Sequence, residues 1–160
     1  EGPSDFVYLT GLKQLLDRSD VNIVSGGGAG NMPKVGTILQ GWGCQVIFLY
    51  DNDKGYKEAL NHIKKEWLTL SKELVGNLGI DGSIEDVFSK EDFATHVLGV
   101  QVDALILKNS EHMRSRDKVL PARLFLEKCR SAQPPQLDDK TKGLAGKLFT
   151  LLDSLFAKAQ

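Results

Sequence analysis

No segment of this sequence limits the possible folds more than the nearly continuous apolar run at residues 45–50 (QVIFLY). Such a run is typical of a strand buried on both faces of a parallel sheet. Parallel strands need crossover connections, and apolar residues at helical spacing occupy residues 4–17 and 33–41. Ser4 is the predicted N-cap of the first of these helices, and Ile38, with its neighbours Val35 and Leu39, is expected on the inward face of the second. A further β-rich run, residues 21–25 (VNIVS), lies between these two helical segments. The alternation predicts an α/β fold with right-handed crossovers.

The rest of the chain continues with helical patterns. We expect helices over residues 56–67, 84–98 and 118–130, and a strongly amphipathic last helix over residues 142–160. A polar, Pro-rich loop at residues 131–139 precedes that last helix. Residues 1–100 are predicted to form the α/β core, and residues 101–160 a helical extension packed on the same domain.

Composition places the chain among ordinary globular domains. Its 160 residues suit one core, and no apolar run approaches the roughly 20 residues of a membrane span. Cys44 and Cys129 each lie among apolar neighbours, which predicts buried free thiols in a cytoplasmic protein. Neither has a Cys or His partner at ligand spacing, so a zinc site is not expected.

The charge balance bears on the class of partner. A stand-alone DNA-binding protein usually has a basic surplus, whereas the formal net charge here is −1. That balance fits a site that reaches DNA through bound metal ions, or a domain whose affinity comes from another part of the protein. It fits equally a protein that never contacts nucleic acid.

Two acidic residues, Asp51 and Asp53, follow the apolar run directly, in the turn DNDKG. In an α/β sheet, functional residues gather at the carboxyl ends of the strands. Paired carboxylates suit Mg²⁺, which takes only one or two carboxylates from the protein and keeps several waters. The alternative is a plain turn, because Asp, Asn and Gly all favour turns.

Two other acidic clusters accompany this pair. Glu1 and Asp5 belong to EGPSD, and we expect Glu1 to follow a strand that lies outside this chain, which we interpret as a fragment. Ser83 and Glu85 belong to GSIEDVFS, just before a helical pattern. Each cluster could also have a purely structural role, since acidic residues in the first turn of a helix interact favourably with the helix dipole.

These motifs carry a resemblance. EGxxD followed by a buried strand ending in DxD resembles the TOPRIM signature of topoisomerases, primases and OLD-type nucleases. Residues 26–43 (GGGAGNMPKVGTILQGWG) and 83–93 (SIEDVFSKEDF) further resemble the overcoming-lysogenization-defect (OLD) family. The resemblance covers residues 1–93 and, more loosely, the two C-terminal helices. It implies a TOPRIM Rossmann-like parallel sheet flanked by helices.

The resemblance also implies a chemistry. The family's EGxxD motif is matched by Glu1 and Asp5, and its DxD motif by Asp51 and Asp53. Members bind two Mg²⁺ or Mn²⁺ ions with such residues and cut DNA. Glu1 is also implied as a general acid or base. In that family the TOPRIM domain follows an ABC-type ATPase in the same polypeptide, and phage defence is the implied role.

Ser83 and Glu85 match the family's later acidic motif, and a C-terminal lysine completes the implied site. Lys118 is our first choice for that lysine, with Lys140 and Lys142 as alternatives. The family's lysine offsets transition-state charge. This chain has no GxxxxGK[ST] phosphate loop, so we do not expect it to hydrolyse ATP by itself.

Other functions remain open on the sequence. Gly26 and Gly28, followed by a helix and by Asp51 at the end of a strand, imitate a dinucleotide-binding unit. Against this, Asn31 replaces the third glycine and Pro33 removes a backbone donor near the helix start. A non-catalytic TOPRIM interaction module and an RNA-cleaving or primer-synthesising enzyme are further alternatives.

Overall fold

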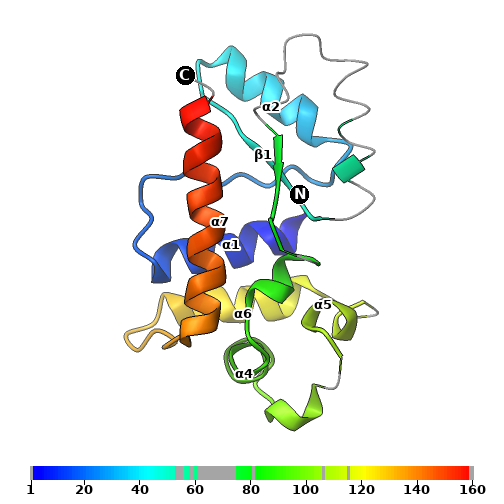
Figure 1. Ribbon diagram of the computed structural model, residues 1–160, viewed down its shortest axis with the longest axis vertical. Helices are drawn as coiled ribbons and strands as arrows, with labels where there is room; N and C mark the ends of the chain where they lie inside the picture. Colours follow the sequence, from blue (N-terminus) through cyan, green and yellow to red (C-terminus); the bar gives the residue numbers. More distant parts are fainter. Residues whose placement is uncertain are drawn as a thin grey trace.

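The computed structural model describes residues 2–52, 56, 57, 60, 75–80, 82–105, 107–114 and 116–158. Within these ranges, helices accompany a small parallel sheet, so the chain has the mixed α/β character predicted from its sequence (Figure 1). Strand β1 (Phe48–Tyr50) pairs in parallel with β2 (Val75–Asn77), and Phe48 lies opposite Val75.

The sheet is smaller than the strand patterns predict. Residues 45–47 precede β1 without joining it, and the described residues 21–25 form no strand. Residues 21–24 instead line, with Ile47 and Leu49, a cavity of about 100 Å³. A β-rich composition favours a strand but supplies no partner for it. This cavity therefore lies between β1 and the residues 21–25 that were predicted to form a strand.

The N-terminal helix α1 (Pro3–Leu15) begins one residue earlier than expected. Proline suits the first helical position, so Gly2 is the N-cap and Ser4, the predicted cap, lies inside the helix. Asp5 falls in the first turn as predicted, and its Oδ2 accepts a hydrogen bond from the Gly2 N–H at 2.6 Å. This bond satisfies one of the backbone donors at the helix start.

Helix α2 (Met32–Gly41) matches the prediction in its bounds but not in its inward face. Met32, Pro33 and Gly36 are buried, whereas Ile38, which we expected inside, is 55% exposed. The reason is the contact between Gly36 and the ring of Phe48, where an added Cβ would overlap the ring. The close approach turns the Gly36 face of the helix toward the sheet.

The helix predicted over residues 84–98 is divided. A 3₁₀ turn, η2 (Ile84–Val87), comes first, and α4 (Lys90–Asp92) then continues into the π-helical segment η3 (Phe93–Leu98). The break follows from Ser89, whose Oγ accepts a hydrogen bond from the Asp92 N–H at 3.0 Å and starts a new helix. The helix expected over residues 56–67 lies largely outside the described residues.

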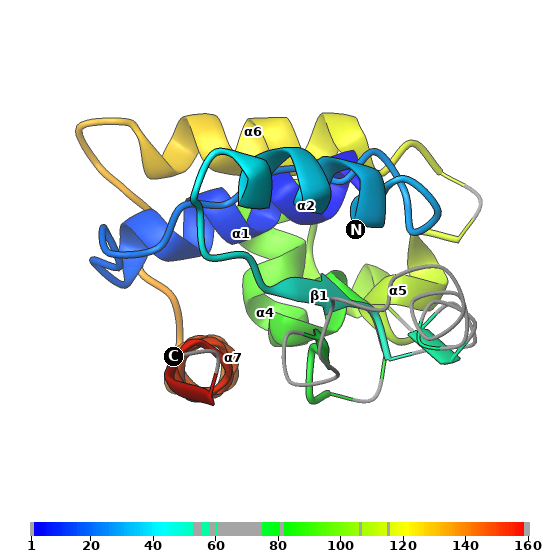
Figure 2. The same ribbon diagram turned by 90° about the horizontal axis from the view of Figure 1, so that it is seen from above.

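Two short elements, η4 (Val102–Ala104) and α5 (Asn109–His112), lead to the two long C-terminal helices. Helix α6 (Val119–Cys129) carries Pro121 in its first turn. Helix α7 (Asp139–Lys158) begins at the last residue of the Pro-rich loop, three residues earlier than predicted. Figures 1 and 2 show α1 and α6 side by side, with α7 running across their direction. Leu148, Leu152 and Leu155 of α7 are buried, as its amphipathic pattern predicts.

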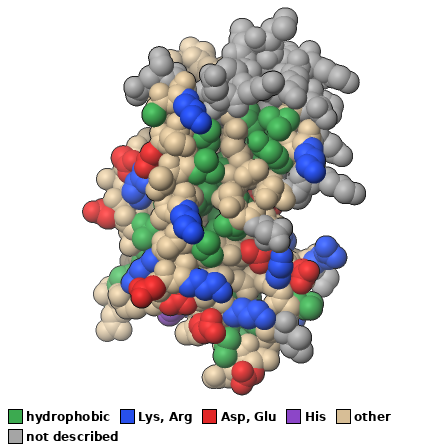
Figure 3. All heavy atoms as spheres, in the orientation of Figure 1, with side chains coloured by type: hydrophobic (Ala, Val, Ile, Leu, Met, Phe, Trp, Pro, Cys, Tyr) green, Lys and Arg blue, Asp and Glu red, His purple; other side chains and the backbone are tan. Residues whose placement is uncertain are grey.

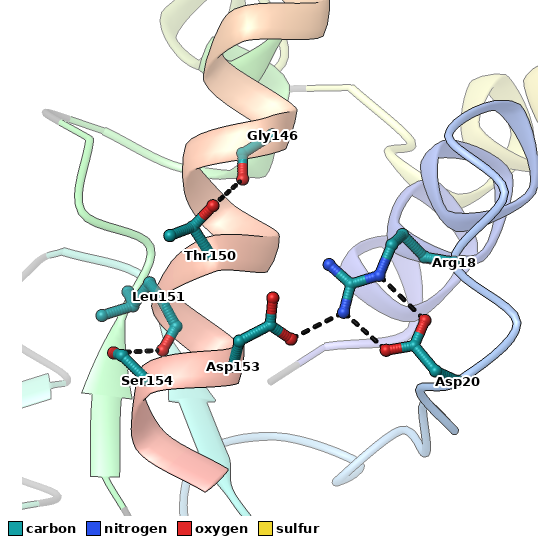
Figure 4. Close-up of polar contacts among 7 residues, drawn as sticks. All are labelled: Arg18, Asp20, Gly146, Thr150, Leu151, Asp153 and Ser154. Carbon is teal, nitrogen blue, oxygen red and sulfur yellow. Dashed lines mark hydrogen bonds and ion pairs between the residues drawn. The ribbon is translucent and has the colours of Figure 1, made fainter. Parts of the chain in front are cut away.

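Arg18 connects the segment after α1 to α7 (Figure 4). Its guanidinium donates to both carboxylate oxygens of Asp20, at 2.8 and 2.6 Å, and to Oδ1 of Asp153 at 2.6 Å. It also lies over the ring of Phe149, 5.0 Å from the ring centre. One side chain thus holds two parts of the chain that are distant in sequence.

The two cysteines differ from each other. Cys129 is buried at the end of α6, as expected, but Cys44 is exposed. Cys44 follows Gly43, whose positive φ of 79° turns the chain after α2, so its apolar sequence neighbours do not cover it. None of the helices in the described part of the chain has the length and apolar character needed to cross a bilayer.

Candidate functional site

The carboxyl ends of the two strands meet at one edge of the sheet. The Leu78 N–H donates to the carbonyl of Tyr50 at 3.0 Å, immediately past the last paired residues. Asn52 then donates from Nδ2 to the carbonyl of Ile80 at 3.1 Å. Asp51 therefore leaves β1 at the same edge from which the chain after β2 runs toward Ser83. This is the edge where α/β sheets usually hold their functional groups.

Glu85 is the most unusual polar residue of this region. It lies in η2, its exposed fraction is 0%, and it forms an ion pair with the Lys118 ammonium, whose Nζ is 3.2 Å from Oε1. Apart from this ion pair, neither carboxylate oxygen has a hydrogen-bond partner among the described residues. Burial raises the pKa of Glu85, and Lys118 opposes the rise.

Helix α1 brings two more groups to Glu85. Tyr8 is fully buried, and its ring meets that of Phe88 edge-on, with the centroids 5.5 Å apart. Burial, then the charge of Glu85, then that of Asp5 raise the pKa of its hydroxyl, which has no hydrogen-bond partner in the described part of the chain. Asp5 also contributes to the raised pKa of Glu85. Asp5, Tyr8, Glu85 and Lys118 therefore share one electrostatic environment.

Ser83 and Asp86 shape the turn around Glu85. Ser83 is the N-cap of η2, and its backbone N–H donates to Oδ2 of Asp86 at 3.2 Å. The other carboxylate oxygen of Asp86 accepts the Ser110 N–H at 3.1 Å. Asp86 is thus occupied by backbone groups, which separates its role from that of the neighbouring Glu85, whose oxygens have no donor among the described residues.

The remaining predicted site residues divide into two groups. Glu1 and Asp53 lie outside the described residues. Lys140 and Lys142 lie at exposed positions of α7, whereas Lys118, at the start of α6, contacts Glu85. Among the three lysines considered, the observed contact favours Lys118.

The donor set fits a hard divalent cation better than a soft one. The described residues contain no group of three His, Cys, Asp or Glu side chains close enough to hold a metal ion, and the predicted ligands Glu1 and Asp53 are outside that part of the chain. Apart from the Lys118 ion pair, the two carboxylate oxygens of Glu85 have no hydrogen-bond partner in that part of the chain. Mg²⁺ and Mn²⁺ prefer such oxygens, so Glu85 fits the expected metal.

A large cavity lies elsewhere in the described part of the chain. It measures about 710 Å³ and opens between residues 20–26, α2, the approach to β1 and the end of α7. Gly26 lines it, but Gly28 and Asp51, the other residues of the dinucleotide-binding alternative, do not. Of the predicted acids and lysines of the metal site that the structure describes, none lines it either. Volume alone does not make this cavity the functional site, because the buried charges are at Glu85.

Sequence reasoning missed Asn109. This residue is 3% exposed, and its Nδ2 donates to the carbonyls of Glu85 and Phe88, both at 2.9 Å. In the sequence it resembles an ordinary helix start, and no local signal connects it with Glu85. Tyr8 was expected in a packing position, and it does pack against Phe88, but its position near Glu85 could not be read from the sequence.

The surface gives no simple electrostatic signal. On the face drawn in Figure 3, acidic and basic side chains are interspersed, in keeping with the net charge of −1. Comparisons with protein families, with curated proteins and with solved structures found no match for this chain. The functional conclusion therefore depends on the residues around Glu85 themselves.

Proposed function

We propose that this chain is a divalent-metal-dependent DNA endonuclease domain of the TOPRIM type, from an ATPase–nuclease of the OLD family. The observation that carries the proposal is the fully buried Glu85, whose two oxygens lack hydrogen-bond donors among the described residues while the Lys118 ammonium lies 3.2 Å from Oε1. A buried carboxylate whose charge one lysine offsets only in part is costly, and such costs are typical of functional sites.

The proposed ligands are Glu1, Asp5, Asp51, Asp53, Ser83 and Glu85. Asp51 and the Ser83 turn follow adjacent parallel strands, which supports their acting at a common edge. Two Mg²⁺ or Mn²⁺ ions, when bound, supply positive charge beside the attacking and departing oxygens of a phosphodiester.

Lys118 and Tyr8 provide the chain's own hydrogen-bond donors. Lys118 is 36% exposed, so its ammonium can contact Glu85 and still reach a phosphate oxygen from the solvent side. A charged donor held at that position offsets negative charge that grows on the phosphate during cleavage. The buried hydroxyl of Tyr8 remains protonated, because its pKa is raised, and it is a donor throughout the neutral pH range.

Nicking of supercoiled plasmid tests the proposal. The wild-type chain should nick DNA with Mg²⁺ or Mn²⁺ and stop when EDTA is added. Glu85→Gln and Lys118→Met should each lower the rate by about 100-fold or more, since each removes a charge aimed at the reaction. Lys140→Met removes an exposed lysine of α7 and should keep the wild-type rate.

A double variant distinguishes loss of metal binding from loss of folding. Asp51→Ala combined with Asp53→Ala should abolish nicking while the far-ultraviolet circular dichroism stays unchanged. Undiminished cleavage by that double variant would refute the metal assignment. Binding of NAD without any divalent ion, together with indifference to DNA, would favour the dinucleotide-binding alternative. Preferential cleavage of an RNA of the same sequence would change the substrate and leave the site assignment intact.

A further inference from the structure

Asn109 closes the turn that carries Glu85. Both hydrogens of its amide are used, because Nδ2 donates to the carbonyl of Glu85 and to that of Phe88, each at 2.9 Å. The two carbonyls belong to the second residue of η2 and to the residue that follows the element. Asn109 is 3% exposed, so these bonds are shielded from water and hold the Glu85 backbone in one position.

Asp86 makes a second connection beside the first. Its Oδ1 accepts the N–H of Ser110 at 3.1 Å, and its Oδ2 accepts the N–H of Ser83 at 3.2 Å. One carboxylate therefore joins the start of the Glu85 turn to the residue that follows Asn109. Gly82 permits this arrangement, because its φ is +138° and an added Cβ would overlap Oδ2 of Asp86.

The segment held by these bonds also leads to Lys118. Helix α5 starts at Asn109, and Met113, which follows α5, is buried at 1% exposure. The chain then reaches Lys118 at the start of α6, where Nζ lies 3.2 Å from Glu85 Oε1. The bonds of Asn109 and Asp86 thus join the Glu85 turn to the start of the segment that leads to Lys118.

We propose that Asn109 and Asp86 are positioning residues, which hold the Glu85 turn and the segment before Lys118 in register for metal binding and cleavage. This inference rests on the proposed nuclease function. Asn109 holds the turn through the two N–H donors of its amide, since its Oδ1 has no hydrogen-bond partner among the described residues. Partners that orient metal ligands typically change metal affinity 10- to 100-fold when they are removed.

The test compares Asn109→Ala and Asp86→Asn with Thr141→Val. Thr141 is buried in the same core, and its Oγ1 accepts the Ser89 N–H at 2.9 Å. Thr141→Val therefore also removes a buried side chain-to-backbone bond, but one that does not touch Glu85 or Asn109. Three quantities are measured for each variant: the Kd for Mn²⁺ by electron paramagnetic resonance, the single-turnover nicking rate at saturating Mn²⁺, and the urea midpoint.

We expect Asn109→Ala to raise the Kd for Mn²⁺ by about 10- to 100-fold and to slow nicking. Asp86→Asn keeps one acceptor oxygen, so it should raise the Kd for Mn²⁺ by a smaller factor. This variant tests the inference in place of Asn109→Ala if Asn109→Ala does not fold. Thr141→Val should lower the urea midpoint without changing the Kd or the rate.

Two results would overturn the inference, and they are distinguishable. If the wild-type chain binds Mn²⁺ and nicks DNA but the folded Asn109→Ala and Asp86→Asn variants match it in Kd and rate, the positioning role is wrong and the proposed function stands. If the wild-type chain neither binds Mn²⁺ nor nicks DNA, the proposed function fails and the inference fails with it.

Discussion

At the scale of single residues, Glu85 is held against the ordinary preference of a carboxylate for water. Its burial disfavours the ionised form, and the nearby Lys118 offsets only part of that penalty, so its pKa stays raised. A bound divalent cation would compensate the charge more fully than one lysine does. The arrangement is therefore costly without metal, which is a common property of binding sites.

Glu85 should make the stability of the metal-free chain depend on pH. Because its folded-state pKa lies above the ordinary value of 4.5, the folded chain retains a proton that the unfolded chain has released. Stability is therefore full below about pH 4.5 and falls as pH rises through the folded pKa. Urea unfolding in EDTA at pH 4–8 should show wild-type stability falling relative to Glu85→Gln, by up to about 1.4 kcal/mol per pH unit. Parallel curves for the two proteins would contradict this.

The two thiols should differ strongly in reactivity. Cys44 is exposed, whereas Cys129 is buried, and burial raises the pKa of Cys129 to about 11. Thiolate is the reactive form, so Cys129 has almost none of it at pH 8. Titration of the native protein with Ellman's reagent should modify one thiol rapidly, and denaturant should release the second. Cys44→Ser should remove the fast phase, and loss of the slow phase instead would invert the assignment.

At the scale of elements, the contact between α1 and α6 is the closest helix packing in the described core. An added Cβ at Gly11 of α1 would lie 2.7 Å from Cε1 of Phe125 and 3.2 Å from Sγ of Cys129 in α6. Overpacking of this kind forces side chains or backbones to shift. The small size of Gly11 thus sets the separation of the helices that carry Asp5, Tyr8 and the C-terminal neighbours of Lys118.

Gly11→Ala and Gly146→Ala should have opposite effects on stability. Gly11→Ala should lower the free energy of unfolding by about 1–3 kcal/mol, because the new methyl group has no room. Gly146 lies in the interior of α7 with nothing within 4 Å of an added Cβ. Alanine at this position should therefore raise the free energy of unfolding by about 0.4–1 kcal/mol. Urea denaturation measures both, and equal effects of the two substitutions would argue against the tight crossing.

The helices were also the elements that the sequence predicted best. The bounds of α2, α6 and α7 follow their apolar periodicity and their flanking Pro and Gly residues to within a few positions. Inward faces were less certain: Ile38 is exposed because Phe48 packs against Gly36 instead. Periodicity locates a helix, but the choice among similar faces depends on the partner surface.

At the scale of the whole molecule, Arg18 ties the N-terminal region to α7. The guanidinium is 21% exposed and pairs with Asp20 and Asp153 while stacking on Phe149. Ion pairs with one partner exposed to solvent contribute little to stability, but the stacking on Phe149 fixes the orientation of the guanidinium. Arg18 therefore contributes to how α7 is seated on the rest of the chain.

Arg18→Met should separate the charge of this contact from its packing. Methionine keeps an apolar stem near Phe149 but loses the ion pairs, so the free energy of unfolding should fall by less than about 1 kcal/mol. The loss should shrink at 1 M NaCl, where surface charges are screened within about 3 Å. Arg130→Met, an exposed arginine after α6, serves as the matched control. A loss that is independent of salt would point to packing instead.

The sequence alone predicted α1, α2, α6 and α7, the strand that ends just before Asp51, and the candidate acids, because capping, periodicity and turn chemistry act over a few residues. It could not determine which distant groups meet. The contact of Lys118 with Glu85, the bonds of Asn109 to the Glu85 turn, and the exposure of Cys44 follow from the path of the chain between elements. Only the tertiary structure decided these, since burial and ion pairing are properties of neighbours in space.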